Sequence, residues 1–232
     1  MRKISVIVPA LDEQAQIQDC LRSALAARGE GPVELVLADG GSTDATIALA
    51  SEVPGVRVVR AVRGRARQQN AGAAAATGDI LVFLHADCRL QPGALAALDR
   101  VASESPQSPG GAFRMELDAP GAPYRVVEAL SHARLRFTRV ACGDQAIWAW
   151  RTAFERVGGF PDQPLMEDVA FTRALARLGR LAVIEKPAVV SSARRFATDG
   201  VVRRTLSNWA ISLAWALGAD VAYLKRFYPE HS

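Results

Sequence analysis

Charged side chains follow four apolar segments in the first ninety residues. The run Ile80–Leu84 is apolar enough to be buried on both faces, yet it ends at His85, Ala86 and Asp87. Earlier runs end in PALDE (9–13), in DGGSTD (39–44) and in an arginine-rich segment (60–67). Carboxylates and phosphate oxygens are typical ligands of Mg²⁺, and arginine binds phosphate through paired hydrogen bonds. The pattern therefore predicts a site for a phosphorylated ligand whose charge is partly neutralised by Mg²⁺ or Mn²⁺.

Each of these segments also has a structural interpretation when it is taken alone. Residues 39–44 are typical of a glycine turn followed by a helix cap, and Arg63, Arg65 and Arg67 of a solvated helix face. His85 is a second metal ligand, a phosphate donor or a buried histidine hydrogen-bonded to the backbone. Because a structural sheet edge does not need four polar loops of both charge signs, we favour the binding interpretation.

The hydrophobic pattern places these loops on one edge of a sheet. Short aliphatic runs alternate with helical spacing, which predicts strands at Ile4–Val8, Val33–Ala38, Val56–Val59 and Ile80–Leu84 and helices at 14–27, 44–51, 66–76 and 92–102. This order is typical of an α/β fold with a mostly parallel sheet covered by helices on both faces. Ligands of such sheets bind outside the carboxyl ends of the strands, where the polar loops lie.

The composition limits the class of protein. The chain has 232 residues, 50% of them hydrophobic, which is enough for a substantial core in one domain or two fused lobes. A net charge of +4 and a pI near 9.3 indicate a mildly cationic surface suited to anionic ligands. The sequence has no helix-turn-helix pattern, zinc-ligand spacing or aromatic RNA-binding signature, so we expect no nucleic-acid partner.

The cysteines and the first residues bear on location. Three widely spaced cysteines without a CxxC pair support neither a disulfide framework nor a zinc site. The start MRKISVIVPA predicts a strand rather than the longer apolar segment of a secretory signal. We therefore expect a cytoplasmic protein.

A second group of residues suited to chemistry lies beyond residue 110. The loop SESPQSPGG (103–111) precedes a predicted strand at Ala112–Leu117 instead of another strand–helix unit. Glu167 and Asp168 precede the helical pattern of residues 169–178, where acidic side chains stabilise the positive end of the helix dipole. A carboxylate at this point can alternatively act as a general base that accepts a proton from an attacking hydroxyl.

Four motifs in this order resemble family 2 glycosyltransferases of the GT-A fold. They are SVIVPALDEQAQI, VLADGGSTDAT, GRARQQNAGAAAATGDILVFLHAD and PLMEDVAFTRALARLG, and together they cover about residues 3–185. Within that family the chain is most similar to the small bacterial branch called rSAM/selenodomain-associated or arsenosugar-biosynthesis glycosyltransferases. The resemblance implies a GT-A (Rossmann-like) sheet with further C-terminal helices, and an inverting transfer of sugar from a nucleotide-diphosphate sugar, UDP by default, to an acceptor hydroxyl.

The resemblance also implies a donor site with a divalent cation. Asp87 matches the last aspartate of the family's metal-binding motif, and His85 stands where the first aspartate usually is. Gly40 stands where many relatives have a second aspartate after Asp39. The residues expected to bind the nucleotide are Pro9, Leu11, Glu13, Asp39, Gly40, Arg65, Arg67, Asn70 and Ala86.

In the second half the resemblance assigns the base and the acceptor site. Asp168 matches the family's usual base, with Glu167 orienting the acceptor, a small molecule or a lipid. Acceptor-binding residues are expected at Asp144, Gln145, Arg194 and Arg195. The expected division is a nucleotide-sugar half (1–110), an acceptor half of the same domain (111–200) and a helical segment (201–232).

Two other function classes remain open. A noncatalytic nucleotide-sugar binding module would keep the loops at Asp39 and Asp87 without requiring Asp168. A nucleotidyltransferase would share the sheet, but it normally has a glycine-rich loop with a basic residue after the first strand, which PALDEQ lacks.

The segment Thr205–Ala219 has no charged residue and lies between two basic pairs, Arg203-Arg204 and Lys225-Arg226. It is shorter than the about 20 residues that a membrane-spanning helix needs. Three interpretations remain: a helix packed on the core, an interfacial helix with tryptophans at the lipid boundary, or a homodimer contact. The second would place residues 203–226 at the inner face of the plasma membrane.

Overall fold

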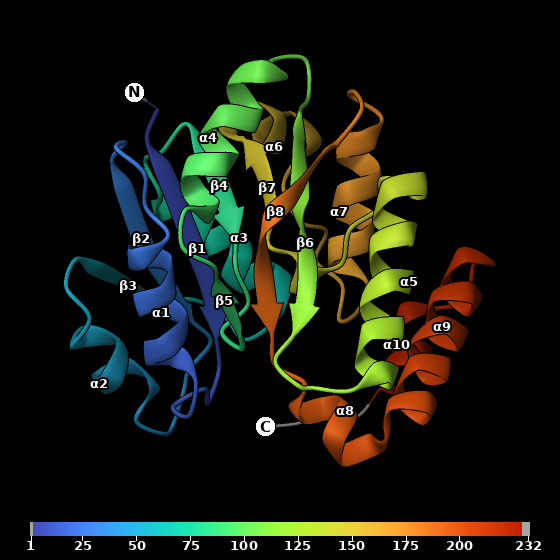
Figure 1. The fold of residues 1–232 in the computed structure, drawn as a ribbon. Helices are drawn as coiled ribbons and strands as arrows, with labels where there is room; N and C mark the ends of the chain where they lie inside the picture. The colour runs from blue at the N-terminus through green and yellow to red at the C-terminus, as the bar shows by residue number, and fades with distance from the viewer. Residues whose placement is uncertain (1, 229–232) are drawn as a thin grey trace.

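One mixed sheet organises the computed structural model, which describes residues 2–228 (Figure 1). Its order is β3-β2-β1-β4-β7-β6-β8-β5. The strands are β1 (Ile4–Ala10), β2 (Val33–Asp39), β3 (Val56–Arg60), β4 (Ile80–Phe83), β5 (Cys88–Leu90), β6 (Gly110–Leu117), β7 (Ile147–Trp150) and β8 (Ala182–Ser191). Strands β1 to β4 pair in parallel, whereas β7 runs antiparallel to both β4 and β6. Strand β8 is parallel to β6 and antiparallel to β5.

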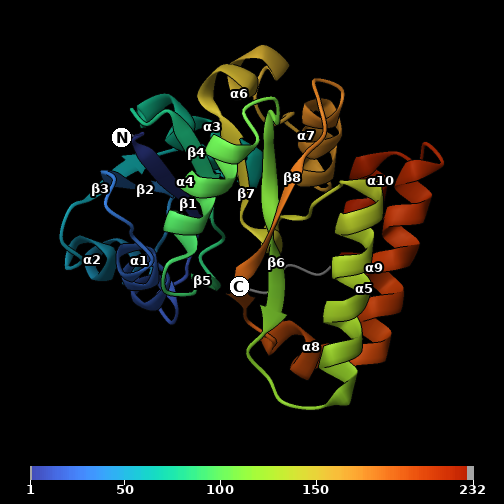
Figure 2. The same ribbon diagram turned by 45° about the horizontal axis from the view of Figure 1, so that its top comes forward.

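Helices cover both faces of this sheet (Figures 1 and 2). They are α1 (Ile17–Ala26), α2 (Thr46–Ser51), α3 (Arg65–Ala75), α4 (Ala94–Glu104), α5 (Ala122–Thr138), α6 (Arg151–Val157), α7 (Glu167–Ala176), α8 (Arg194–Asp199), α9 (Val201–Ala216) and α10 (Val221–Lys225). Helices α1, α2 and α4 contribute to the core on one face, and α3, α6 and α7 to the core on the other. Helix α9 lies beside α5 on the side away from β3, and α8 lies near the carboxyl end of β6 (Figures 1 and 2).

The alternation of side chains along the central strands builds the two cores. In β4, Ile80 and Val82 join the core with α1 and α4, while Leu81 and Phe83 point to the other face. Successive side chains of a strand point to opposite faces, so a continuous apolar run is needed where both faces are covered. This is why the run before His85 is uninterrupted.

Helix α3 lies unusually close to the sheet. A Cβ at Gly72 would overlap the side chain of Ile7, so only glycine allows this approach. The buried amide of Gln68 donates hydrogen bonds to the carbonyls of Ala10 (2.7 Å) and Ala38 (3.1 Å). These contacts fix the carboxyl ends of β1 and β2, where the donor loops begin.

The predicted α/β class is confirmed: helices cover both faces of the sheet, and further helices follow at the C-terminal end of the described chain. Two large elements were absent from the sequence-based prediction: α5 and strand β8, which lies next to the edge strand β5. The division at residue 110 coincides with the first residue of β6, but both halves share one sheet, and the domain boundaries stay a prediction.

The C-terminal segment forms a helix beside α5. Helix α9 begins at Val201 and ends at Ala216, somewhat earlier than the sequence indicated. Within the described residues, no helix combines the length and the apolar character needed to cross a bilayer.

Candidate active site

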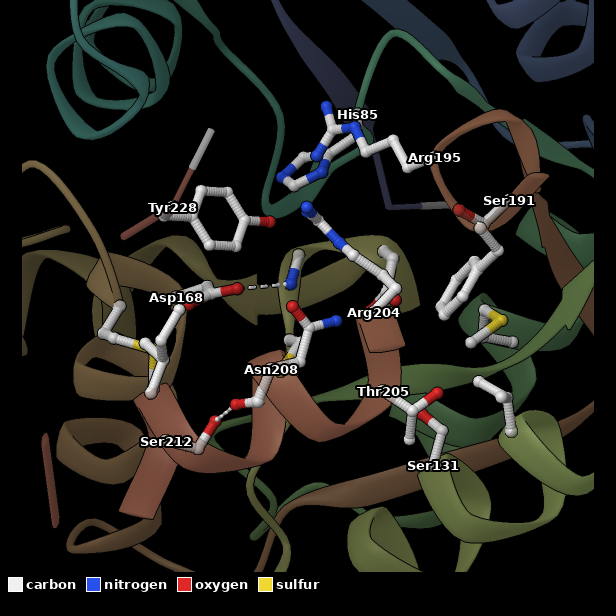
Figure 3. A pocket seen from close by; sticks show the side chains of 18 of the residues that line it. His85, Ser131, Asp168, Ser191, Arg195, Arg204, Thr205, Asn208, Ser212 and Tyr228 are labelled. Atoms are coloured by element: carbon white, nitrogen blue, oxygen red, sulfur yellow. Dashed lines mark hydrogen bonds between the residues drawn. The ribbon is translucent and has the colours of Figure 1, made fainter. Parts of the chain in front are cut away.

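A cavity of about 480 Å³ lies at the carboxyl end of the sheet, where the segments after β4 and β8 meet α5, α7 and α9 (Figure 3). It brings together charged residues that are far apart in the sequence. The predicted site residues that line it are Arg65, His85, Asp87, Asp144, Glu167, Asp168 and Arg195. Carboxylates and guanidinium groups thus surround one space, as the polar strand ends suggested.

Asp168 is held at the start of α7, which begins at Glu167. Its Oδ2 accepts a hydrogen bond from the backbone N–H of Gly143 (2.7 Å), and its Oδ1 accepts one from Val169 (2.7 Å). These bonds fix the carboxylate against the 3₁₀ turn Gly143–Gln145. Each carboxylate oxygen has two acceptor positions, so Asp168 can still accept a proton or hydrogen bond from a ligand in the cavity.

Glu167 is the buried neighbour of that carboxylate, with 2% of its surface exposed. Arg65 Nη1 lies 3.4 Å from Glu167 Oε1. Burial raises the pKa of Glu167, and the like charge of Asp168 raises it further, while Arg65 opposes the shift. Arg65 keeps 37% of its side-chain surface exposed, so it can also bind an anion in the cavity.

Asp87 lies in the loop between β4 and β5, directly before β5, and faces Arg195. Arg195 Nη2 is 3.7 Å from Asp87 Oδ2. Burial opposes ionisation of Asp87, but His85 and the guanidinium groups of Arg195 and Arg65 lower the pKa of its carboxyl below the ordinary value. Asp87 is therefore an ionised carboxylate near neutral pH, as a cation ligand must be.

His85 is enclosed beneath the 3₁₀ turn. A Cβ at Gly143 would overlap its imidazole ring, so the turn lies directly on the histidine. Its Nε2 is buried and has no hydrogen-bond partner within the part of the chain that the structure describes. Burial and the nearby charge of Arg65 lower the pKa of His85 to about 3, so the ring is neutral at pH 7. One of the three interpretations of His85 was a buried histidine hydrogen-bonded to the backbone. Among the described residues, its Nε2 makes no such bond.

The donor set fits a divalent cation held by one protein carboxylate. The residues that the structure describes contain no cluster of three or more His, Cys, Asp or Glu side chains arranged for a metal. Mg²⁺, however, commonly takes one or two carboxylates and completes its shell with substrate phosphates and water. Asp87 satisfies that requirement, and the unpartnered His85 Nε2 is a second candidate ligand beside it.

Asp144 and Gln145 have different surroundings. Asp144 lines the cavity, and its Oδ1 is buried without a partner. Burial raises the pKa of Asp144 to about 6, with Arg134 opposing the shift and Asp168 adding to it. The Gln145 Oε1 instead accepts from Arg134 Nη2 (2.9 Å) and from the backbone N–H of Cys142 (3.0 Å), which holds the turn together outside the cavity.

The predicted nucleotide loops lie beside the cavity, and their own hydrogen bonds order them. Asp39 is 1% exposed, and its carboxylate accepts from the N–H groups of Gly41 (2.9 Å) and Ser42 (3.2 Å). Asp12 Oδ1 accepts from the N–H of Thr43 (2.7 Å), which joins the loops after β1 and β2. These contacts match the turn interpretation, and a contact of Asp39 with a base stays a prediction.

The other loop residues predicted to bind the nucleotide differ in their surroundings. A Cβ at Gly40 would lie 2.9 Å from the side-chain amide of Gln68, so a larger residue there would require the Gln68 side chain to move. Burial and the charge of Asp87 raise the pKa of Glu13, which places this loop residue in the electrostatic reach of the cavity. Pro9 and Ala86 are buried core residues, and Leu11 is partly exposed.

The structure separates the residues predicted on α3. Arg65 lines the cavity, whereas Arg67 Nε lies 2.9 Å from Asp162 Oδ1 at the surface, outside it. Asn70 accepts from the N–H of Phe160 (2.9 Å) and donates to its carbonyl (2.8 Å), so it fastens α3 to the chain before α7. Of the two arginines on α8, Arg195 lines the cavity and Arg194 is exposed.

Polar residues of α5 and α9 line a part of the cavity that sequence reasoning missed. We call it the inner chamber; its polar residues are Ser131, Arg204, Thr205, Asn208 and Ser212. Figure 3 shows Arg204 and Asn208 projecting from α9 toward the space that Asp168 faces. The available signal was the spacing of Arg204, Asn208 and Ser212 by four residues, which places them on one helix face.

Two of these residues have buried polar atoms. Arg204 is 4% exposed; its Nη1 lies 3.2 Å from Asp199 Oδ2 and its guanidinium 4.6 Å from the centre of the Tyr228 ring. Asn208 is partly exposed, but its Oδ1 atom is buried and has no hydrogen-bond partner among the residues that the structure describes. An unpaired buried acceptor is costly, so this atom is suited to a ligand that donates a hydrogen bond.

Residues 5–146 match the family model described as Glycosyl transferase family 2, and this match covers more than half of the chain. The chain belongs to glycosyltransferase family 2. Members of this family generally use a divalent cation.

Curated relatives of this family 2 glycosyltransferase match it in part. A PGL/p-HBAD biosynthesis glycosyltransferase of Mycobacterium bovis is 32% identical over 163 residues, covering 67% of this chain and 62% of that protein. An undecaprenyl-phosphate 4-deoxy-4-formamido-L-arabinose transferase of Sodalis glossinidius is 32% identical over 111 residues. This match covers 44% of this chain and 34% of the Sodalis protein. The chain spans about a third of the length of the first curated relatives that it matches.

Solved structures confirm the GT-A fold of the family 2 chain. Staphylococcus aureus TarS superposes with a TM-score of 0.66 at 18% identity, covering 97% of this chain and 42% of TarS. A shorter TarS structure in complex with UDP-GlcNAc gives a TM-score of 0.62 at 19% identity, covering 82% of this chain and 58% of that one.

Proposed function

We propose that this chain transfers a sugar from a nucleotide-diphosphate sugar to an acceptor hydroxyl with inversion, and that Asp168 is the general base. The observation that carries the proposal is the position of Asp168 in one cavity with the Asp87–Arg195 pair. Transfer needs a base on the acceptor side and positive charge on the leaving-group side. Arg65, Arg195 and a cation ligand supply the second requirement.

The donor is proposed to bind across the loops after β1 and β2, with its diphosphate at Asp87. UDP is the proposed nucleotide, supported by the TarS structures in complex with UDP-GlcNAc and UDP. Mg²⁺ or Mn²⁺ held by Asp87, with His85 as the second candidate ligand, would neutralise diphosphate charge when bound. Arg65 and Arg195 face the same place and add to that neutralisation.

The chain's own residues then perform a single displacement. Asp168 accepts the proton of the acceptor hydroxyl as that oxygen forms its bond to the anomeric carbon of the sugar. The bond from that carbon to the diphosphate oxygen breaks, and its electron pair leaves with the nucleoside diphosphate. Because the attack and the departure occur on opposite faces, one carboxylate suffices and the configuration inverts.

The acceptor is proposed to occupy the inner chamber, on the side of Asp168 opposite the donor loops. Its lining combines the polar atoms of Arg204 and Asn208 with the apolar side chains of Val127, Leu130 and Ile211. An acceptor with a hydroxyl-bearing end and an apolar portion suits this lining. The Sodalis relative, named for an undecaprenyl-phosphate substrate, supports a lipid within this class.

Calorimetric titration with UDP, GDP, TDP and CDP, with and without Mn²⁺, tests the donor site. We expect metal-dependent binding of one nucleotide by the wild type and its loss in Asp87→Ala. Asp162→Ala is the matched control, since Asp162 is an exposed carboxylate outside the cavity. Failure of every nucleotide to bind would refute the donor site. Binding without release of nucleotide from any nucleotide sugar would favour a noncatalytic binding module.

A further inference from the structure

Helix α9 turns a polar side toward a cavity inside the protein and an apolar side toward the surface. Arg204, Asn208 and Ser212 face the inner chamber, and five large apolar residues face outward. The outward residues and their exposed fractions are Val202 70%, Leu206 59%, Trp209 56%, Leu213 62% and Leu217 80%. Their spacing of three or four residues places them on one stripe. A surface helix normally turns such a stripe toward the core, so this stripe requires another apolar or interfacial environment.

Helix α5 carries a matching stripe. Val126, Leu130 and Phe137 are 56%, 40% and 82% exposed, and their spacing of four and seven residues places them on one side of the helix. Helices α5 and α9 lie side by side in both views of the fold (Figures 1 and 2). We call the two stripes together the α5–α9 face.

The α5–α9 face continues into the mouth of the cavity. Leu130 of α5 and Trp209 of α9 are exposed and also line the cavity. The two stripes therefore meet at the rim of the inner chamber. An extended exposed apolar surface on a soluble domain marks an interaction site, and here that site borders the opening to Asp168.

The exposed charged side chains of α5 and α9 themselves are all arginines. Arg125, Arg136 and Arg203 are exposed on α5 and α9. The acidic residue of these two helices, Glu128, is 4% exposed and paired with Arg125 at 2.7 Å. Glu185 of β8 lies 3.6 Å from Arg136, at the edge of the face. Apolar side chains flanked by cations are typical of helices that lie in the headgroup region of an anionic membrane.

We propose that the α5–α9 face binds the surface of an anionic membrane, with both helices lying on the bilayer and the mouth of the cavity turned toward the headgroups. A second copy of the chain suits the face less well. A twofold contact brings the same patch of both copies together, so the exposed arginines of both copies would gather at one interface, whereas anionic lipids neutralise them. Trp209 at the rim suits this interfacial depth.

The binding part of the proposal stands apart from the chemistry. Only its consequence, that the acceptor enters the inner chamber from the lipid side, rests on the proposed function. Membrane binding is measured without substrate, and nucleotide binding is measured without membrane. The failure of either one is thus visible separately.

Cosedimentation of the full chain with vesicles tests the proposal. We expect binding to phosphatidylcholine vesicles that contain a quarter phosphatidylglycerol, and weaker binding to pure phosphatidylcholine or at high salt. The double variant Leu206→Gln, Leu213→Gln should bind the anionic vesicles about tenfold more weakly, because both side chains are exposed and neither lines the cavity. Val62→Gln, at a residue that is 66% exposed elsewhere, is the matched control and should bind like the wild type.

Thermal unfolding and UDP titration of the double variant check that its fold and donor loops are intact. Equal sedimentation by the double variant and the wild type would overturn the proposal, as would no sedimentation of the wild type with anionic vesicles. Light scattering distinguishes membrane binding from contact with a second copy. A wild type that is dimeric and a double variant that is monomeric would assign the face to a second copy and overturn the membrane proposal.

Discussion

Replacing Asp168 by asparagine removes the proposed base and keeps the shape of the side chain. The wild-type carboxylate accepts two backbone hydrogen bonds, from Gly143 and from Val169, both at 2.7 Å. Asparagine has one carbonyl oxygen, so it keeps one of these bonds and presents an N–H group to the other donor. Loss of a hydrogen bond to a charged group costs about 1.5–3 kcal/mol of folding stability.

A second effect of the same substitution favours the folded state. The charge of Asp168 raises the pKa of both Glu167 and Asp144, and therefore repels these carboxylates when they are ionised. Asparagine removes that repulsion, so the net loss of stability should lie below the hydrogen-bond cost. The variant is expected to fold and to bind nucleotide with unchanged affinity.

The effect on turnover should be much larger. Loss of a general base lowers the rate by about 10²–10⁴, which corresponds to about 2.7–5.5 kcal/mol of transition-state free energy. The assay is the release of nucleoside diphosphate from the sugar nucleotide that calorimetry identifies, with acceptor extracts or water as the acceptor. Asp162→Asn makes the same chemical change on an exposed carboxylate and should retain full turnover.

Two results would refute the reasoning about Asp168. A folded Asp168→Asn variant whose turnover lies within threefold of the wild type would show that another group accepts the proton. Loss of nucleotide affinity together with turnover would place Asp168 in the donor site instead of beside the acceptor.

Three further predictions concern other residues of the cavity. Because burial raises the pKa of Asp144 to about 6 from an unfolded value of 3.8, the folded chain holds this proton where the unfolded chain has lost it, so the free energy of unfolding falls as pH rises through this window. Asp144→Asn should remove that fall, on the order of 1–3 kcal/mol, in urea titrations at pH 4 and pH 7. If the free energy of unfolding changed with pH equally in the variant and the wild type, this prediction would be wrong. Arg65→Ala should weaken UDP binding at least tenfold, on the order of magnitude expected when charge-assisted bonds to phosphate are lost. Arg67→Ala should change calorimetric affinity and thermal stability little, since exposed ion pairs contribute little to stability. Gly143→Ala should cost about 1–3 kcal/mol in chemical denaturation through its overlap with His85, and unchanged stability would show that the turn can move off the ring.

The parts of the site that follow short apolar runs could be predicted from the sequence. A run such as Ile80–Leu84 signals a strand by itself, and the residue after it is then fixed at the sheet edge. Asp87 is placed in this way, in the loop after β4, and the local pattern and chain direction are sufficient for it. Asp168 lies at the start of α7, where its role was predicted from the resemblance to the family.

The choice between Arg65 and Arg67 could not be made from sequence. Both lie in the first turn of α3, two residues apart, which places them about 200° apart around the helix. One must face away from the cavity, but the low hydrophobic contrast of this alanine-rich helix does not indicate which. The deciding contact is with Asp162, which lies 95 residues further along the chain.

Helix α9 shows a different limit of sequence reasoning. Its amphipathic pattern is visible once Arg204, Asn208 and Ser212 are counted as one face, but the usual rule would turn that polar face toward solvent. The structure does the opposite because the polar residues line a cavity. Strand β8 was missed because its sequence contains Glu185, Lys186 and Pro187, and its place in the sheet depends on pairing with β6 and β5, which are distant in sequence.

The attachment of α9 has a consequence for how specificity can change. The loops proposed to hold the donor come from the first ninety residues, whereas the wall of the inner chamber made by α9 begins after Gly200, follows α8 and packs beside α5. Exchanging residues 200–228 for the equivalent segment of another member of the family therefore leaves the sequence of β1, β2 and β4 unchanged. A library varied in this segment alone would test whether the proposed acceptor site can be altered while the proposed donor site stays the same, which would make acceptor choice a modular and engineerable property.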